Sequence, residues 1–219
     1  MTFNELSLVA RLLDPVKDQP HVKVKAESKR RINVDCSARL NSLFFGDKDS
    51  VLISRKDIFA ISRTEVELFT LSVLYWGFPK DYNGICTNAL RSWTELTGLV
   101  RRVRNHRIMD GDYYSGLEQT MRDIDGINTS TFSKLFYFAK ASIDGNDCVI
   151  MDSFVKRGIH KLTGDDFAIL KESIVGANSY RVYPRYLSAI SDLSRQIGVK
   201  AQNLEYALWL LGKQKNLVL

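Results

Sequence analysis

Apolar residues recur along most of the chain at intervals of three and four, which is the spacing of one face of an α-helix. This periodicity predicts helices over residues 5–13, 35–44, 55–75, 87–96, 100–108, 113–124, 129–141, 165–175, 180–196 and 201–211. One short apolar run, 148–151, is better suited to a strand. The pattern therefore predicts an all-α protein with very little sheet.

Glycine and proline mark the ends of these segments. We expect Gly46 to end the helix over 35–44, Gly98 to separate 87–96 from 100–108, and Gly212 to cap the last helix. Before the second helix, a basic and proline-flanked stretch through about Arg31 is predicted to be a loop. We interpret residues 1–219 as one domain with two helical lobes, which flank a central helix pair over about 113–141 and a segment over 147–160.

The composition is that of an ordinary globular protein, with 45% hydrophobic and 26% charged residues among 219. No apolar run approaches the ~20 residues of a membrane helix, and no secretory leader is visible, so we expect a cytoplasmic monomer. The formal net charge of +6 suits a polyanionic partner. The basic residues gather in two groups, around 23–31 and 101–107, although either group could equally be a solvated face.

The three cysteines and three histidines are widely scattered. No pair among them has the spacing of metal ligands, and the odd number of cysteines fits a reducing compartment. We therefore expect neither a metal nor any other cofactor.

Residues Gly126-Ile127-Asn128 form a predicted tight turn between two helices. Gly126 permits a positive φ, Ile127 can plug into the core, and Asn128 tolerates the left-handed conformation. Such a turn exposes backbone N–H groups at the start of the second helix, where they attract a phosphate. Capping of that helix by Asn128, Thr129 or Ser130 is the simpler interpretation.

Two ionisable residues follow this turn. On a helical wheel Lys134 shares a face with Ser130 and Tyr137, opposite the apolar stripe of the same helix, so its default interpretation is a solvated lysine. Asp152 follows the apolar run 148–151 and begins the next helix, where the helix dipole favours an ionised carboxylate. Plain N-capping would explain this aspartate equally well.

This order of elements resembles the helix-hairpin-helix-GPD superfamily of DNA glycosylases, and most closely its 8-oxoguanine glycosylase branch. The resemblance covers about forty residues, from Met121 to Ile159, and the closing segment LEYALWLLGK is similar to small bacterial members. It implies that Asp152 is the catalytic aspartate. The four-cysteine cluster of the endonuclease III and adenine-glycosylase branches is missing.

The chain departs from the family pattern at two positions. Asn128 stands in place of the second hairpin glycine, and Ser130 stands where bifunctional members carry the nucleophilic lysine. Lys134 lies one helical turn later, about 6 Å further along, and is our candidate for a displaced nucleophile. Otherwise the enzyme would be monofunctional and use water.

The resemblance implies base excision repair of double-stranded DNA with a flipped-out base, an 8-oxoguanine-like purine, with AP-lyase activity through a lysine Schiff base. Candidate DNA-binding residues are Gly126, Asn128, Thr129, Ser130, Arg101 and Arg104. Candidate base-pocket residues are Trp76, Gln202, Tyr206 and Trp209, although aromatic residues at helical spacing are more often core. The alternatives are a non-catalytic DNA-binding module, suggested by Ser130, and a glycosylase acting on modified phage bases or nucleotides in anti-phage defence.

Overall fold

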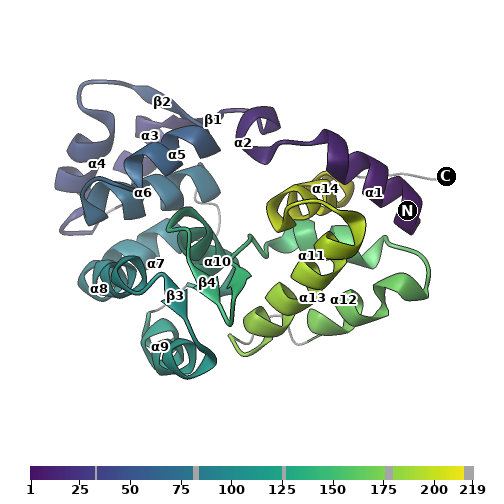
Figure 1. Ribbon diagram of the computed structural model, residues 1–219. Helices are drawn as coiled ribbons and strands as arrows, with labels where there is room; N and C mark the ends of the chain where they lie inside the picture. The colour runs from purple at the N-terminus through teal and green to yellow at the C-terminus, as the bar shows by residue number, and fades with distance from the viewer. Residues whose placement is uncertain (33, 81–83, 125–126, 176–179, 215–219) are drawn as a thin grey trace.

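A computed structural model describes residues 1–32, 34–80, 84–124, 127–175 and 180–214 (Figure 1). It is mostly helical, with 67% of residues in helices and only two small sheets among the described residues. The helices are α1 (Phe3–Leu12), α2 (Pro15–Asp18), α3 (Ala26–Arg30), α4 (Ser37–Phe45), α5 (Arg55–Ile61), α6 (Val66–Gly77), α7 (Ile85–Arg91), α8 (Trp93–Asn105), α9 (Gly111–Asp123), α10 (Thr129–Phe138), α11 (Ser153–His160), η1 (Asp165–Phe167), α12 (Ala168–Ser173), α13 (Val182–Ile197) and α14 (Ala201–Lys213).

The strands are short, with two to four residues each. β1 (Val22–Lys25) pairs antiparallel with β2 (Ser50–Ile53), with Val22 opposite Ile53. β3 (Ile108–Met109) pairs parallel with β4 (Ser142–Ile143), which pairs antiparallel with β5 (Asn146–Asp147). The prediction of a mostly helical protein is confirmed.

Helix α10 lies in the centre of the molecule (Figure 1). The β1–β2 ribbon and α3–α6 lie on one side of it, and α11–α14 lie on the other. Helix α1 packs against α14, so the two ends of the described chain meet on that second side. The interpretation as two lobes of one domain stays a prediction.

The helices begin where side chains satisfy their free N–H groups. Ser54 begins α5 with a capping box, in which its hydroxyl accepts from the Asp57 N–H and the Asp57 carboxylate accepts from the Ser54 N–H. Asn128 caps α10 and Asp152 caps α11 through their side-chain oxygens. Helix α10 of the predicted helix pair and helix α11, which follows it, are therefore anchored at their N-termini by polar residues.

Two predicted helix boundaries were wrong. The segment 55–75 is two helices, because the hydroxyls of Ser62 and Thr64 donate to carbonyl oxygens three residues earlier and end α5. In contrast, α8 runs straight through Gly98, since a glycine inside a helix costs only about 1 kcal/mol. The actual break lies at Ser92, where the backbone leaves the helical region.

The predicted loop through Arg31 was also wrong, because it contains α2, β1 and α3. The side chain of Lys29 in this stretch is fully buried. Its Nζ donates to the Phe78 carbonyl oxygen over 2.5 Å and lies 4.7 Å from the Tyr75 ring. The early basic group is thus not a continuous solvated face.

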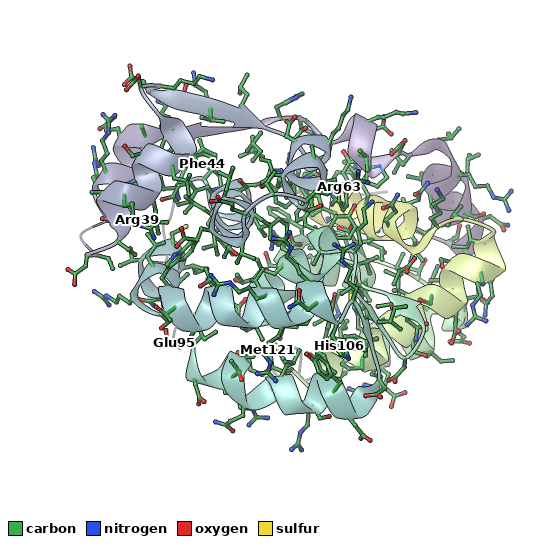
Figure 2. All side chains as sticks on the ribbon, turned by 60° about the vertical axis from the view of Figure 1, so that its left-hand side comes forward. Arg39, Phe44, Arg63, Glu95, His106 and Met121 are labelled. Carbon is green, nitrogen blue, oxygen red and sulfur yellow. The ribbon has the colours of Figure 1, made fainter. Side chains whose placement is uncertain are left out.

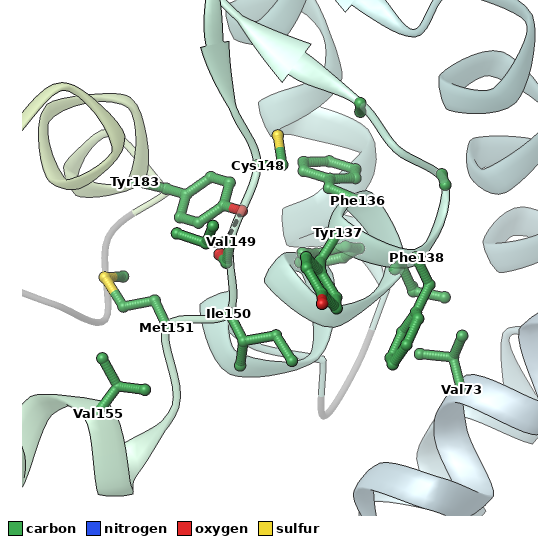
Figure 3. Close-up of a cluster of buried hydrophobic side chains, with 14 of the residues drawn as sticks. Val73, Phe136, Tyr137, Phe138, Cys148, Val149, Ile150, Met151, Val155 and Tyr183 are labelled. Carbon is green, nitrogen blue, oxygen red and sulfur yellow. Dashed lines mark hydrogen bonds between the residues drawn. The ribbon is translucent and has the colours of Figure 1, made fainter. Parts of the chain in front are cut away.

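The run 148–151 is extended but pairs with no strand among the described residues, so the strand prediction was wrong. Side chains take the place of a partner strand. The Tyr183 and Tyr186 hydroxyls donate to the carbonyl oxygens of Val149 and Ile150 over 2.8 and 3.0 Å. Figure 3 shows this segment passing between Tyr183 and α10. It leads directly to Asp152.

Gly212 does not cap the last helix as predicted but lies within α14. A Cβ at this position would stand 1.8 Å from the carbonyl oxygen of Phe154 in α11, and a Cβ at Gly158 would stand 2.0 Å from that of Leu208. Glycine is therefore required by the close approach of two backbones. The contact fixes α11, which Asp152 begins, against α14.

Candidate active site

Lys134 and Asp152 meet in the interior of the protein. Lys134 Nζ lies 3.9 Å from Asp152 Oδ2, and the two side chains are only 6% and 15% exposed. Helix α10 is buried on nearly all sides, so the expected solvated face of Lys134 does not exist. An ammonium group this deep is uncommon in a protein interior.

Asp152 is fixed by the helix that it begins. Its Oδ1 accepts from the backbone N–H groups of Phe154 and Val155 over 2.9 and 3.0 Å. These bonds and the helix dipole stabilise the carboxylate. Oδ2 is the oxygen that faces Lys134.

Lys134 is fixed by its own helix. Its Nζ donates to the Ser130 carbonyl oxygen over 3.0 Å and to Ser130 Oγ over 2.8 Å. The Phe78 ring centre lies 5.3 Å from Nζ. A Cβ at Gly77 would stand 3.0 Å from Lys134 Cδ, so this glycine leaves room for the lysine stem.

Burial lowers the pKa of the Lys134 ammonium below that of a free lysine. The charges of Asp152 and Glu205 raise the pKa, and those of Arg55 and Lys156 lower it further. The net direction is downward. A larger fraction of Lys134 is therefore a neutral amine at a given pH, as nucleophilic attack requires.

Ser133 links the helix of Lys134 to the segment that carries Asp152. The Ser133 hydroxyl accepts from the Met151 N–H over 3.0 Å and donates to the Ser130 carbonyl oxygen, also over 3.0 Å. Ser133 is fully buried. The Ser133 hydroxyl thus joins the backbone of α10 near Lys134 to the backbone of the residue before Asp152.

A second buried charged pair, Arg55 and Glu205, joins α5 to α14. The guanidinium donates to both carboxylate oxygens over 3.0 and 3.2 Å, and to the Tyr137 hydroxyl over 3.1 Å. It also donates to the side chain of Gln19. Both members are essentially without solvent exposure.

The predicted base-pocket residues gather around this pair. The Arg55 guanidinium lies 5.8 Å from the Trp76 ring and 5.6 Å from the Tyr206 ring. Gln202 accepts from the Tyr137 hydroxyl over 3.3 Å, and Trp209 stacks on Tyr206 at 5.7 Å. The buried indole N–H of Trp76 has no acceptor among the described residues.

A surface pocket of about 410 Å³ opens between the C-terminal end of α10 and the start of α14. Gln202 is the predicted base-pocket residue that lines this pocket, and Tyr137 lines it as well. Lys134 and Asp152 do not line it. The remaining wall is formed by Phe59, Lys140, Ala141, Asp147, Cys148, Val149, Lys200 and Ala201.

The predicted DNA-binding residues occupy different environments. Gly126 lies outside the described residues. Asn128 has an extended backbone, with φ of −119°, and caps α10, so the expected left-handed conformation at this residue was wrong. Thr129 is buried, and Ser130 bonds Lys134.

The two predicted arginines lie on α8, whose outward side chains are visible between Glu95 and His106 in Figure 2. Arg101 is exposed. Arg104 is partly buried, donates to the Thr64 carbonyl oxygen over 2.9 Å and lies 5.6 Å from the Phe69 ring. Arg101 is thus the freer of the two to meet a phosphate.

In this mostly helical chain Lys134 thus lies beside the helix-capping Asp152. The family model described as "Putative 8-oxoguanine DNA glycosylase OGG-like protein" matches residues 17–209. The chain belongs to this family. No curated protein and no solved structure matches the chain.

No helix among the described residues is long and apolar enough to cross a membrane. Within the same residues no group of three or more His, Cys, Asp or Glu side chains could hold a metal ion.

Sequence reasoning missed Ser133 and the Arg55–Glu205 pair. Glu205 carried a signal, since it is a lone acid within the apolar run of α14 and so requires a buried partner. Arg55 and Ser133 carried no such signal. An arginine at the start of a helix and a serine within a helix are both ordinary in sequence.

Proposed function

We propose that this protein is a DNA glycosylase with lyase activity, in which Lys134 is the nucleophile and Asp152 stabilises the transition state. The observation that supports the proposal best is the 3.9 Å approach of Lys134 Nζ to Asp152 Oδ2 in a nearly closed site. A non-catalytic descendant of a glycosylase has no reason to keep a buried lysine beside a carboxylate, because burying such groups destabilises the fold.

In the proposed reaction the bond between the base nitrogen and C1′ breaks, and the base leaves with the bonding electrons. Positive charge develops on the sugar and is stabilised by Asp152 through a low-dielectric gap. The neutral Lys134 amine bonds to C1′, and its surplus proton passes to Asp152 or to the departing base. Opening of the sugar ring gives a Schiff base, from which β-elimination cleaves the strand on the 3′ side.

The proposed substrate is double-stranded DNA that carries an 8-oxoguanine-like purine. Membership of the 8-oxoguanine glycosylase-like family supports this choice. The aromatic rings and amide groups around Arg55 could stack on a flipped base and bond its edge. The exposed Arg101 and the start of α10 would bind the phosphates.

The proposal is tested with duplexes that contain 8-oxoguanine or other modified bases, in the presence of borohydride. We expect base release and a covalent protein–DNA adduct from the wild-type protein. Lys134→Ala should remove the adduct, whereas Lys56→Ala, which changes an exposed lysine of α5, should leave it unchanged. Base release without any adduct would instead support a monofunctional enzyme that uses water.

A third result would contradict both forms. If the wild-type protein releases no base from any modified duplex while it binds them, and Asp152→Asn binds equally well, the protein is a binding module.

A further inference from the structure

We propose that Ser130 is a positioning residue that aims the nucleophilic amine of Lys134, an inference that rests on the proposed function. Ser130 stands where the resemblance places a lysine, and in this chain it bonds the lysine one turn later. Its Oγ and its carbonyl oxygen accept from Lys134 Nζ over 2.8 and 3.0 Å. Both distances are those of well-formed hydrogen bonds.

These two bonds fix the direction of attack. A neutral lysine amine has two N–H bonds and one lone pair in a tetrahedral arrangement about nitrogen. When both N–H bonds point at the oxygens of Ser130, the lone pair points away from that residue. Asp152 Oδ2 lies near the amine but beyond hydrogen-bond distance, at 3.9 Å. A C1′ atom beside Asp152 would then meet the lone pair.

Of the two acceptors, the Ser130 hydroxyl belongs to the side chain and depends on the residue at position 130, whereas any residue there supplies the carbonyl oxygen. Among the described residues it is the side-chain acceptor within hydrogen-bond distance of Nζ. The carbonyl oxygen of Ser130 is shared, because it also accepts from the Ser133 hydroxyl. An alanine at position 130 would therefore leave one N–H of the amine without a fixed direction.

Among the described residues, the other groups around the amine act through charge or through packing, not through a directed bond. The Phe78 ring borders the amine from the end of α6. The charged groups that influence Lys134 come from three helices: Arg55 of α5, Asp152 and Lys156 beside and within α11, and Glu205 of α14. Removal of the Ser130 hydroxyl leaves all of these in place, so its effect can be isolated.

The test compares wild-type, Ser130→Ala and Ser130→Thr proteins in borohydride trapping under single-turnover conditions, as a function of pH. For Ser130→Ala we expect the plateau rate at high pH to fall about tenfold, the equivalent of about 1.4 kcal/mol. The midpoint of the profile should also move to lower pH, because the lost acceptor stabilised the ammonium form. Ser130→Thr keeps a hydroxyl and should restore both values.

Ser173→Ala is a matched control, since it removes a buried helical hydroxyl that, within the described part of the chain, bonds just the Leu170 carbonyl oxygen of its own helix, α12. It should change neither the plateau nor the midpoint. Thermal unfolding establishes that each variant is folded. If Ser130→Ala does not fold, Ser130→Cys carries the same comparison, because a thiol is a weak acceptor of similar size.

Two outcomes separate this inference from the proposed function. An adduct in the wild-type protein that forms at the same rate and with the same midpoint in Ser130→Ala overturns the role of Ser130 alone. No adduct in the wild-type protein overturns the nucleophilic role of Lys134, and the role of Ser130 with it.

Discussion

The protein contains two buried charged pairs that differ in how well they are bonded. Arg55 and Glu205 form two direct hydrogen bonds, and Gln19 and Tyr137 occupy further donors of the guanidinium. Lys134 Nζ and Asp152 Oδ2 are 3.9 Å apart. The Lys134 amine donates to Ser130 of its own helix, and the Asp152 carboxylate accepts from backbone N–H groups of the helix that it begins.

The difference separates a structural pair from a reactive one. Arg55 and Glu205 neutralise each other and tie α5 to α14, so neither is available for chemistry. Lys134 keeps a lowered pKa because its neighbouring carboxylate does not compensate fully for burial. Reactive groups are characteristically held in such incompletely stabilised surroundings.

A large effect on the rate of base release is expected at Asp152. Asp152→Asn keeps the shape and one capping oxygen but removes the charge that stabilises the developing sugar cation. We expect the single-turnover rate of base release to fall by about 10²–10³-fold. The thermal unfolding temperature should change little. An unchanged rate would show that the carboxylate is only a helix cap.

The largest expected effect on stability comes from Arg55. Arg55→Met leaves Glu205 buried without a partner, which should lower the free energy of unfolding by about 3–5 kcal/mol. The double variant Arg55→Met with Glu205→Met should recover most of this loss, because neither charge remains. Urea unfolding at neutral pH measures both. Equal losses in the single and double variants would contradict the structural role of the pair.

Removal of the Lys134 charge should stabilise the fold, in contrast to removal of the Arg55 charge. Lys134→Met removes a buried ammonium and should raise the free energy of unfolding by about 1–2 kcal/mol at pH 7, while it abolishes the adduct. Because the folded pKa lies below the unfolded value of about 10.5, wild-type stability rises between the two pKa values as the pH increases. The advantage of the variant should therefore shrink as the pH approaches 10.5. A stability difference independent of pH would contradict the lowered pKa.

The smallest effect is expected at a partly exposed pair, Arg39 and Glu67. The Arg39 guanidinium and the Trp93 indole N–H donate to Glu67 and lower its pKa to about 2. The stabilisation is present above about pH 4.5 and is lost as the pH falls towards 2. Since Arg39 is 59% exposed, we expect Glu67→Gln to cost no more than about 1 kcal/mol at pH 7. Urea unfolding at pH 7 and pH 3 measures the change, and a larger loss at pH 3 would contradict this account.

The sequence predicted the helices better than it predicted their ends. Apolar periodicity located α1, α4, α9, α10, α13 and α14, because a buried stripe repeats at the helical period whatever surrounds it. It failed at Gly98, because a glycine inside a helix costs only about 1 kcal/mol and does not have to end it. Gly212 was misread for another reason, because the carbonyl oxygen that requires a glycine there belongs to another helix.

The candidate site was predictable only in part. Asp152 follows a recognisable pattern and lies where a helix begins, as expected. The burial of Lys134 was not predictable from the helical wheel, because the face it shares with Ser130 and Tyr137 is covered by residues distant in sequence. The bond between Lys134 and Ser130 follows from the direction of a long side chain, which points back along its helix.

The identity of the trapped lysine is the most direct test of the central claim. The wild-type protein is reacted with a duplex carrying 8-oxoguanine or an abasic site, reduced with borohydride, digested and analysed by mass spectrometry. The proposed function predicts that the sugar adduct lies on Lys134 and that this residue is no longer cleaved by trypsin. An adduct on another lysine, such as Lys156, would contradict it.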